Sequence, residues 1–299
     1  MSVPPTMADP VALSTVSGPK YGFRAEVVRF LSRPSNAIYS ALAVFIVLAA
    51  ILAPVLTPYG EAQMNFGARL QPPSAAHPMG TDQFGRDILT RVLYGARISL
   101  LVGFASIGIA MVIGTAVGAV AAYVGGIVDD ILMRLIDVLM SVPGVVLALA
   151  IVAVLEPGLI SIIIALSVIR VSQFARVTRG SVLVVMRQEY VAACHVIGTS
   201  ATRIVMRHIL PNILGPIIVL ATVRFGNAIL AEATLSFLGL GIQPPAASWG
   251  VLIANGNESL FSAPWISLFP GLALLLTMLA FNLLGDGLRD HIDPDSRNG

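Results

Sequence analysis

Residues 189–212 read EYVAACHVIGTSATRIVMRHILPN and form a polar island in a chain that is otherwise mostly apolar. The pattern predicts a short helix over residues 189–197, a break at Gly198, a second short helix over residues 199–208 and a stop at Pro211. The island contains no nucleophile paired with a base, so we interpret it as a docking surface and not as a catalytic site.

The composition predicts an integral membrane protein. Of the 299 residues, 56% are hydrophobic and 11% are charged, whereas a soluble domain usually carries about 25% charged residues. The mean hydropathy is +0.86. The formal net charge of +2 gives no support for nucleic-acid binding.

Two residue counts exclude classes of site. Lys20 is the only lysine and Tyr21 follows it, so the chain has no Gly-Lys-Ser/Thr phosphate loop, and another chain would have to bind any ATP. Cys194 is the only cysteine, which excludes an internal disulfide and a cysteine-based metal cluster.

Apolar runs predict an all-α fold with six transmembrane helices. The expected spans are residues 37–56, 98–123, 142–155, 159–171, 213–235 and 265–284. Ser35 and Asn36 would cap the first span. The third would continue from an amphipathic helix across Pro143, and Arg170 would end the fourth and extend to water.

Loop charge predicts the orientation of these spans. Five arginines precede the fifth span, which makes that loop cytoplasmic by the positive-inside rule: Arg176, Arg179, Arg187, Arg203 and Arg207. Residues 1–36 and 286–299 are then cytoplasmic tails, and residues 57–97 form an extracytoplasmic loop, despite the four arginines of that loop.

Three polar groups admit two interpretations each. Asp82, Arg86, Asp87 and Arg91 form either a salt-bridged loop, which we favour, or an acid–base site. Asp129, Asp130 and Asp137 lie either at the water boundary, where Asp130 can pair with Arg134, or at a cation site. His195 and His208 have no third ligand nearby, so we predict no metal site.

The spans themselves carry two further signals. Arg224 and Glu232 are ionisable residues at membrane depth, and we interpret them as possible translocation-path residues, with a structural pair to another helix as the alternative for Arg224. A ridge of small residues in the second span predicts close helix packing, within this chain or with a partner: Ser106, Ala110, Gly114, Gly118 and Ala122.

The island resembles the EAA loop of ABC-importer permeases in Glu189, Ala192, Ala193, Gly198 and the HILPN sequence from His208 to Asn212, which includes Pro211. Three more stretches resemble the C-type subunit of the dipeptide and oligopeptide branch. They are HPMGTDQFGRD at residues 77–87, LSFLGLGIQPP at residues 235–245 and GDGLRD at residues 285–290. His195 and Cys194 depart from the family, which usually has Arg and Ala there.

The resemblance implies a type I ABC importer permease fold in a prokaryotic inner membrane. It divides the chain into the tails, a first span at residues 37–56 and a core domain at residues 98–285, with a cytoplasmic coupling loop at residues 174–211. It implies a second homologous permease, two ATP-binding-cassette ATPase subunits that bind ATP and Mg²⁺, and an extracytoplasmic peptide-binding protein. This chain itself would bind no cofactor.

The alternatives to peptide import are another cargo, an intramembrane enzyme and a channel or scaffold subunit. Nickel or another small solute is the alternative cargo, because related permeases share the motifs. An intramembrane enzyme would need a nucleophile with a base, or two histidines with a carboxylate, and the spans show neither. A channel or scaffold subunit would leave the island unexplained.

Overall fold

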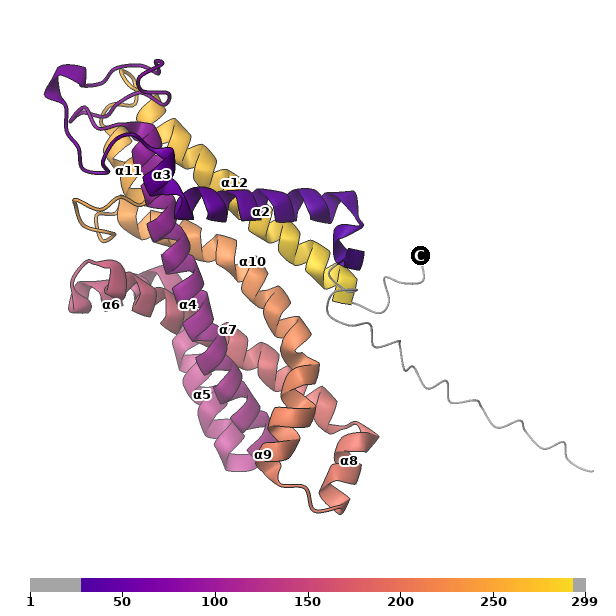
Figure 1. Ribbon diagram of the computed structural model, residues 1–299. Coiled ribbons are helices and arrows are strands. Elements are labelled where there is room, and N and C mark those ends of the chain that lie inside the picture. The colour runs from indigo at the N-terminus through magenta and orange to yellow at the C-terminus, as the bar shows by residue number, and fades with distance from the viewer. Residues whose placement is uncertain (1–27, 293–299) are drawn as a thin grey trace, which may run out of the picture.

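The computed structural model describes residues 28–292, so residues 1–27 and 293–299 of the two predicted tails lie outside the described part. Within that part, five helices are long and apolar enough to cross a membrane, and a bent pair makes a sixth candidate. Figure 1 shows α8 (Glu189–Val196) and α9 (Ala201–Ile204), the segment with the predicted coupling role, at one end of the molecule. The loop before α4 and the helix α11 (Trp249–Asn257) lie at the other end.

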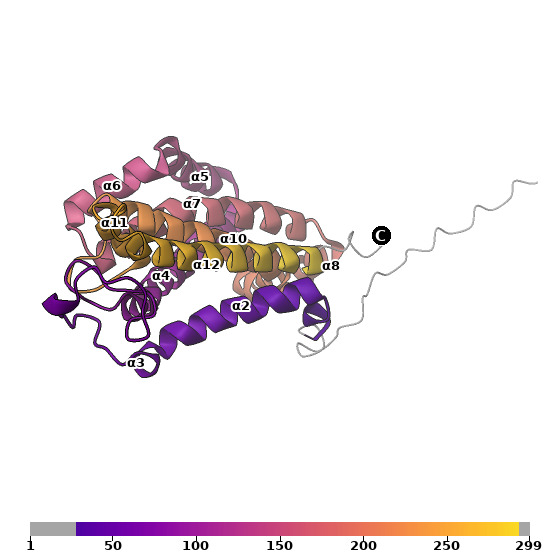
Figure 2. The ribbon, with the colours of Figure 1, turned by 90° about the horizontal axis from the view of Figure 1, so that it is seen from above.

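The first candidate span is α2 (Pro34–Ile51), followed by the short α3 (Ala53–Leu56). Its predicted cap is wrong, because Arg33 precedes the helix without a side-chain bond and Pro34 fills the first turn. Asn36 is instead buried inside the helix against Gly287 of α12 (Trp265–Ile292). Figure 2 shows α2 running along α12 on the outside of the bundle.

The second span, α4 (Ile88–Val124), begins ten residues before the predicted start at residue 98. Asp87 is its N-cap, and its Oδ2 accepts from the Thr90 amide and the Thr90 hydroxyl, both at 2.8 Å. The charged residues after Asp87 resemble a loop in sequence, but Arg91 is buried in the first turns of the helix.

The small-residue ridge of α4 packs within this chain, against α7 (Leu159–Met186). A Cβ on Gly114 would lie 2.6 Å from the carbonyl oxygen of Val171, and one on Gly118 would meet the carbonyl oxygen of Ala175. Any larger side chain would therefore push the two helices apart.

The predicted third span is not one continuous helix, because α5 (Gly126–Ser141) and α6 (Gly144–Leu155) meet at 90°. Pro143 has no amide hydrogen to donate, and Val142 before it is extended. The 12-residue α6 is roughly 18 Å long at 1.5 Å per residue, short of the roughly 30 Å of a bilayer core.

The fourth span is longer than predicted. Helix α7 runs to Met186, so Arg170 lies near its middle and not at its end. The first part of the predicted coupling loop at residues 174–211 is therefore helical. The fifth span, α10 (Leu210–Phe237), also begins earlier than predicted and contains Pro211 in its first turn.

Candidate functional site

Helix α8 is a short helix held by one apolar side chain. Val191 is 1% exposed and packs in a cluster with Ile204 and Ile209. Glu189 occupies the first turn, where a carboxylate favours the helix dipole. Val196 and Ile197 at the other end are 88% and 76% exposed. Two neighbouring apolar side chains in this position leave a surface suited to a partner.

The break after α8 lies where the sequence predicts it. Gly198 has φ of +75°, a left-handed conformation that favours glycine. Its amide donates to the His195 carbonyl oxygen at 3.1 Å, and the Thr199 amide donates to the Cys194 carbonyl oxygen at 3.0 Å. These two bonds are the Schellman pattern that ends a helix.

The predicted stop at Pro211 is wrong. The five residues Val205–Ile209 form a π-helical turn, in which the Leu210 amide donates to the Val205 carbonyl oxygen, and the chain then continues into α10. Proline is tolerated in the first turn of a helix because its missing amide hydrogen would have no standard partner there. The segment after Gly198 is thus a bent extension of the fifth span.

A polar link joins α8 to the start of α10. The Asn212 side-chain amide donates to the Tyr190 hydroxyl at 3.2 Å and to the His208 carbonyl oxygen at 2.5 Å. Sequence reasoning quoted Asn212 only as part of a motif and missed Tyr190. A side-chain hydrogen bond thus connects α8 with the helix that forms the fifth span.

The remaining predicted coupling residues lie on the same segment. Ala192 and Ala193 are exposed, and His208 is half-buried in the π-helical turn. Of the two departures from the family, His195 is exposed and Cys194 is half-buried. The His195 ring lies over Tyr123 at the end of α4, with 6.3 Å between ring centroids. Their coupling role stays a prediction, because geometry alone does not test it.

The loop before α4 is a salt-bridged structure. Asp82 Oδ2 accepts from Arg86 Nε at 2.6 Å, and His77 Nδ1 lies 2.9 Å from Asp87 Oδ1. The loop also packs on the bundle, since Trp265 Nε1 donates to the Thr81 carbonyl oxygen at 3.1 Å. Both carboxylates are committed to these partners, which favours the structural interpretation over an acid–base site.

The carboxylates of α5 pair with α7. Asp129 accepts two bonds from Arg179 at 2.5 and 2.6 Å, and Asp137 accepts from Arg176 at 2.6 Å. The predicted pair between Asp130 and Arg134 is not among the ion pairs of residues 28–292, in which Asp129 and Asp137 pair with α7 instead. No group of three or more His, Cys, Asp or Glu side chains between residues 28 and 292 is placed to hold a metal ion.

Glu232 is fully buried where three helices meet. Its carboxylate accepts from Ser99 of α4 at 3.2 Å and from Ser236 at 2.7 Å, and Ser99 also accepts from the Trp249 amide of α11. This environment supports a packing role, and a path role for Glu232 stays a prediction.

Arg224 lies at the middle of α10, half-buried, and its Nε is buried without a hydrogen-bond partner. On the neighbouring α7, Arg170 and Gln173 also carry buried atoms without partners, Nε and Oε1 respectively. Sequence reasoning missed both as membrane-depth residues because it ended this span at residue 171.

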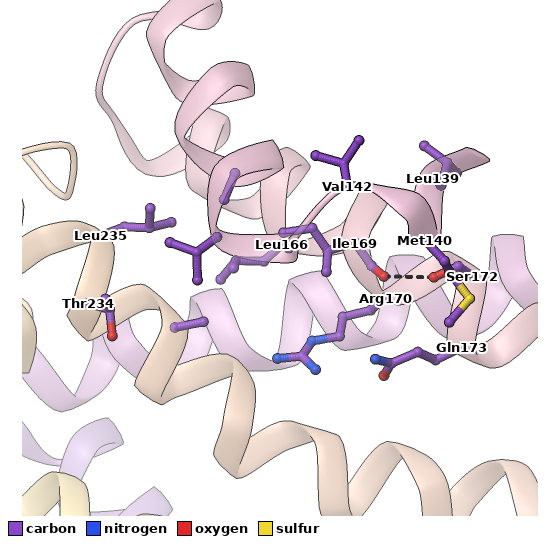
Figure 3. A pocket seen from close by; sticks show the side chains of 14 residues that line it. Leu139, Met140, Val142, Leu166, Ile169, Arg170, Ser172, Gln173, Thr234 and Leu235 are labelled. Carbon is purple, nitrogen blue, oxygen red and sulfur yellow. Dashed lines mark hydrogen bonds between the residues drawn. The ribbon is translucent and has the colours of Figure 1, made fainter. Parts of the chain in front are cut away.

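A cavity of about 350 Å³ opens beside Arg170 and Gln173, under the bend between α5 and α6, and Arg224 is not among its lining residues. Its lining is mostly apolar, with polar side chains from Arg170, Ser172, Gln173 and Thr234. Figure 3 shows the Arg170 and Gln173 side chains extending from α7 in the same direction.

Two family descriptions match this chain. Residues 114–298 match the "Binding-protein-dependent transport system inner membrane component", and residues 26–73 match the "N-terminal TM domain of oligopeptide transport permease C". The first match covers the helices from the second half of α4 to α12, and the second match covers α2 and α3.

Several proteins with similar sequences are named as permeases of transport systems. A dipeptide transport system permease of Alkalihalophilus pseudofirmus is 46% identical over 84% of this chain and 83% of its own length. One from Bacillus subtilis is 41% identical over 95% and 89%. A glutathione transport system permease of Pectobacterium atrosepticum is 42% identical over 89% of both chains.

A solved chain of the MetNI methionine ABC transporter, in an inward-facing conformation, shares the fold. It has a TM-score of 0.56 and 18% identity, covering 68% of this chain and 97% of that chain. The prediction of an all-α membrane permease fold is confirmed, with five of the six predicted spans formed by single helices and the sixth only if the bent pair of α5 and α6 counts as one span.

Proposed function

Because the chain belongs to the inner membrane components of binding-protein-dependent transport systems, we propose that it forms one half of the translocation path of a di- and oligopeptide importer. It is the membrane permease of an ATP-binding-cassette transporter and not the ATPase. The N-terminal match to oligopeptide permease C and the peptide names of its relatives support the cargo class. Nickel or another small solute is the less supported alternative.

The observation that carries the mechanism is the joint between α8 and α10. The exposed Val196 and Ile197 offer α8 an apolar contact with an ATPase subunit. Closure of the ATPases would move α8 about the Gly198 turn, and the link from Tyr190 to Asn212 would pass that motion to α10. ATP must favour one of the two states of the path for transport to follow.

The partners follow from this role. A second homologous permease would complete the path, two ATPase subunits would bind ATP and Mg²⁺, and an extracytoplasmic protein would deliver the peptide. The chain itself would bind no cofactor. We propose no catalytic residues in this chain.

We propose that both termini face the cytoplasm, as α8 does. The two ends of the described chain lie together, with 5.7 Å between the ring centroids of Phe30 and His291. An even number of crossings is needed to bring both ends to one side, which requires α5 and α6 to count as one span.

The test is gentle extraction of the tagged chain from its native membrane, followed by identification of co-purifying proteins. Two ATPase chains and a second permease are the expected result, with peptide-stimulated ATP hydrolysis after reconstitution. A chain that comes out alone, or as a homo-oligomer without an ATPase, would refute the importer role and favour a channel.

A further inference from the structure

Two arginines occupy the middle of two membrane-spanning helices. Arg170 is the twelfth of the 28 residues of α7, and Arg224 is the fifteenth of the 28 residues of α10. A cationic side chain at the centre of a bilayer is costly unless it faces a watery cavity or finds an anion. Each of these two side chains therefore needs a watery cavity or an anion beside it.

No carboxylate within residues 28–292 forms an ion pair with either arginine. Arg170 Nη2 donates to the Asn227 carbonyl oxygen at 3.3 Å, a neutral acceptor. Their helices, α7 and α10, pack against each other. Glu232, two turns further along α10, is occupied by Ser99 and Ser236. The pair thus has donor capacity and positive charge without a counter-ion.

The cavity under the α5–α6 bend gives the Arg170 guanidinium access to a ligand. Its volume of about 350 Å³ lies in the range of roughly 300–1,000 Å³ typical of small-molecule sites. Arg170 and Gln173 both line it, and the Gln173 Oε1 atom is a buried acceptor without a donor. A mostly apolar wall with a few polar groups is the usual form of such a site.

We propose that Arg170 forms a binding station for the carboxylate of the transported peptide, with Arg224 of the neighbouring α10 adding positive charge and Gln173 available to accept from a peptide amide. A guanidinium group matches a carboxylate with two parallel hydrogen bonds, which makes the contact strong and directional. This inference rests on the proposed peptide import and adds the group by which the permease recognises its cargo. The alternative source of a carboxylate is an acidic side chain of the second permease.

The test uses the complete transporter, with both permeases, the ATPases and the binding protein, in proteoliposomes. Uptake of labelled alanine peptides of two to five residues is compared with uptake of the same peptides amidated at the C-terminus. ATP hydrolysis is measured in the same vesicles. The variants are Arg170→Gln, Arg224→Gln and the charge-retaining Arg170→Lys and Arg224→Lys. Arg97→Gln, at an exposed position of α4, is the control for loss of charge.

We expect each glutamine variant to import about tenfold fewer peptides with a free C-terminal carboxylate per ATP hydrolysed, as loss of one charge-assisted contact implies. Each glutamine variant should also lose the preference for the free carboxylate over the C-terminal amide. The lysine variants should fall between these and the wild type, and Arg97→Gln should match the wild type. Because both readouts are ratios within one preparation, a lower amount of folded protein does not mimic the effect. If a glutamine variant fails to insert into the membrane, the lysine variant at the same position provides the test.

Unchanged ratios in the inserted variants would overturn the binding station while leaving peptide import intact. Loss of the second permease on purification, with unchanged preference for the free carboxylate, would assign the arginines to a carboxylate of that partner. A wild-type complex that imports none of the alanine peptides would instead refute the proposed cargo, and the binding station with it.

Discussion

Gly198 shows how one residue ends a helix, here α8, at a position that the sequence also predicts. Its φ of +75° and the two bonds that end α8 are typical of glycine after a helix. Pro211 shows the opposite case. Proline usually signals a helix end, but the π-helical turn before it lets the chain continue into α10. Local residue preferences thus predicted the first boundary and mispredicted the second.

Replacing Gly198 with proline should abolish transport while leaving the chain inserted. Proline requires φ near about −65° and has no amide hydrogen, so the turn between α8 and α9 cannot form as observed. Uptake and membrane abundance are the two measurements. Gly198→Asn is the control, because asparagine tolerates the left-handed region. Normal uptake by the proline variant would show that this turn has no coupling role.

Replacing Glu232 with leucine should lower the thermal stability of the complex. The Ser99 and Ser236 hydroxyls would lose their acceptor in a buried site, at a cost of about 1–3 kcal/mol. The unfolding midpoint in detergent checks this, with Glu258→Leu at an exposed position as the control. Equal midpoints for the two variants would contradict the packing role and return Glu232 to the path.

At the scale of elements, apolar runs located the spans but not their ends. Helix α4 starts early because Asp87 caps it, and α7 continues past Arg170 because its polar residues face other helices. Arg179, for example, is paired with Asp129 of α5 across 50 positions. Such tertiary partners are invisible to a single-sequence pattern, which treats charged helix residues as loop. The two mid-membrane arginines were missed as a pair for this reason.

The docking surface of α8 gives an element-scale prediction. Val196→Asp should weaken retention of the ATPase at least roughly tenfold, because burying an unpaired carboxylate against an apolar contact costs more than about 2 kcal/mol. Co-purification of the ATPase with the tagged chain is the readout. Phe261→Asp, an equally exposed apolar position at the opposite end, should retain it. Equal retention by both variants would place the ATPase contact elsewhere.

At the scale of the whole molecule, the sequence predicted the class of protein and the segment that would face the ATPase. Composition was sufficient for the class, because the apolar fraction exceeds what a soluble domain of this length could bury. Pro143 marks the break between α5 and α6 in the sequence, but its 90° angle was not predicted, because a proline ends a helix without setting the direction of the next one. That bend creates the cavity beside Arg170.

The most direct test of the central claim is site-specific cross-linking from α8 in the assembled transporter. Cys194 is the only cysteine, so Cys194→Ser gives a cysteine-free chain in which Val196→Cys or Phe261→Cys can be introduced. With a short cysteine–lysine reagent, the account predicts a covalent product with an ATPase subunit from position 196 and none from position 261. Absence of that product from position 196, or its formation from position 261, would contradict the docking of α8 on the ATPase.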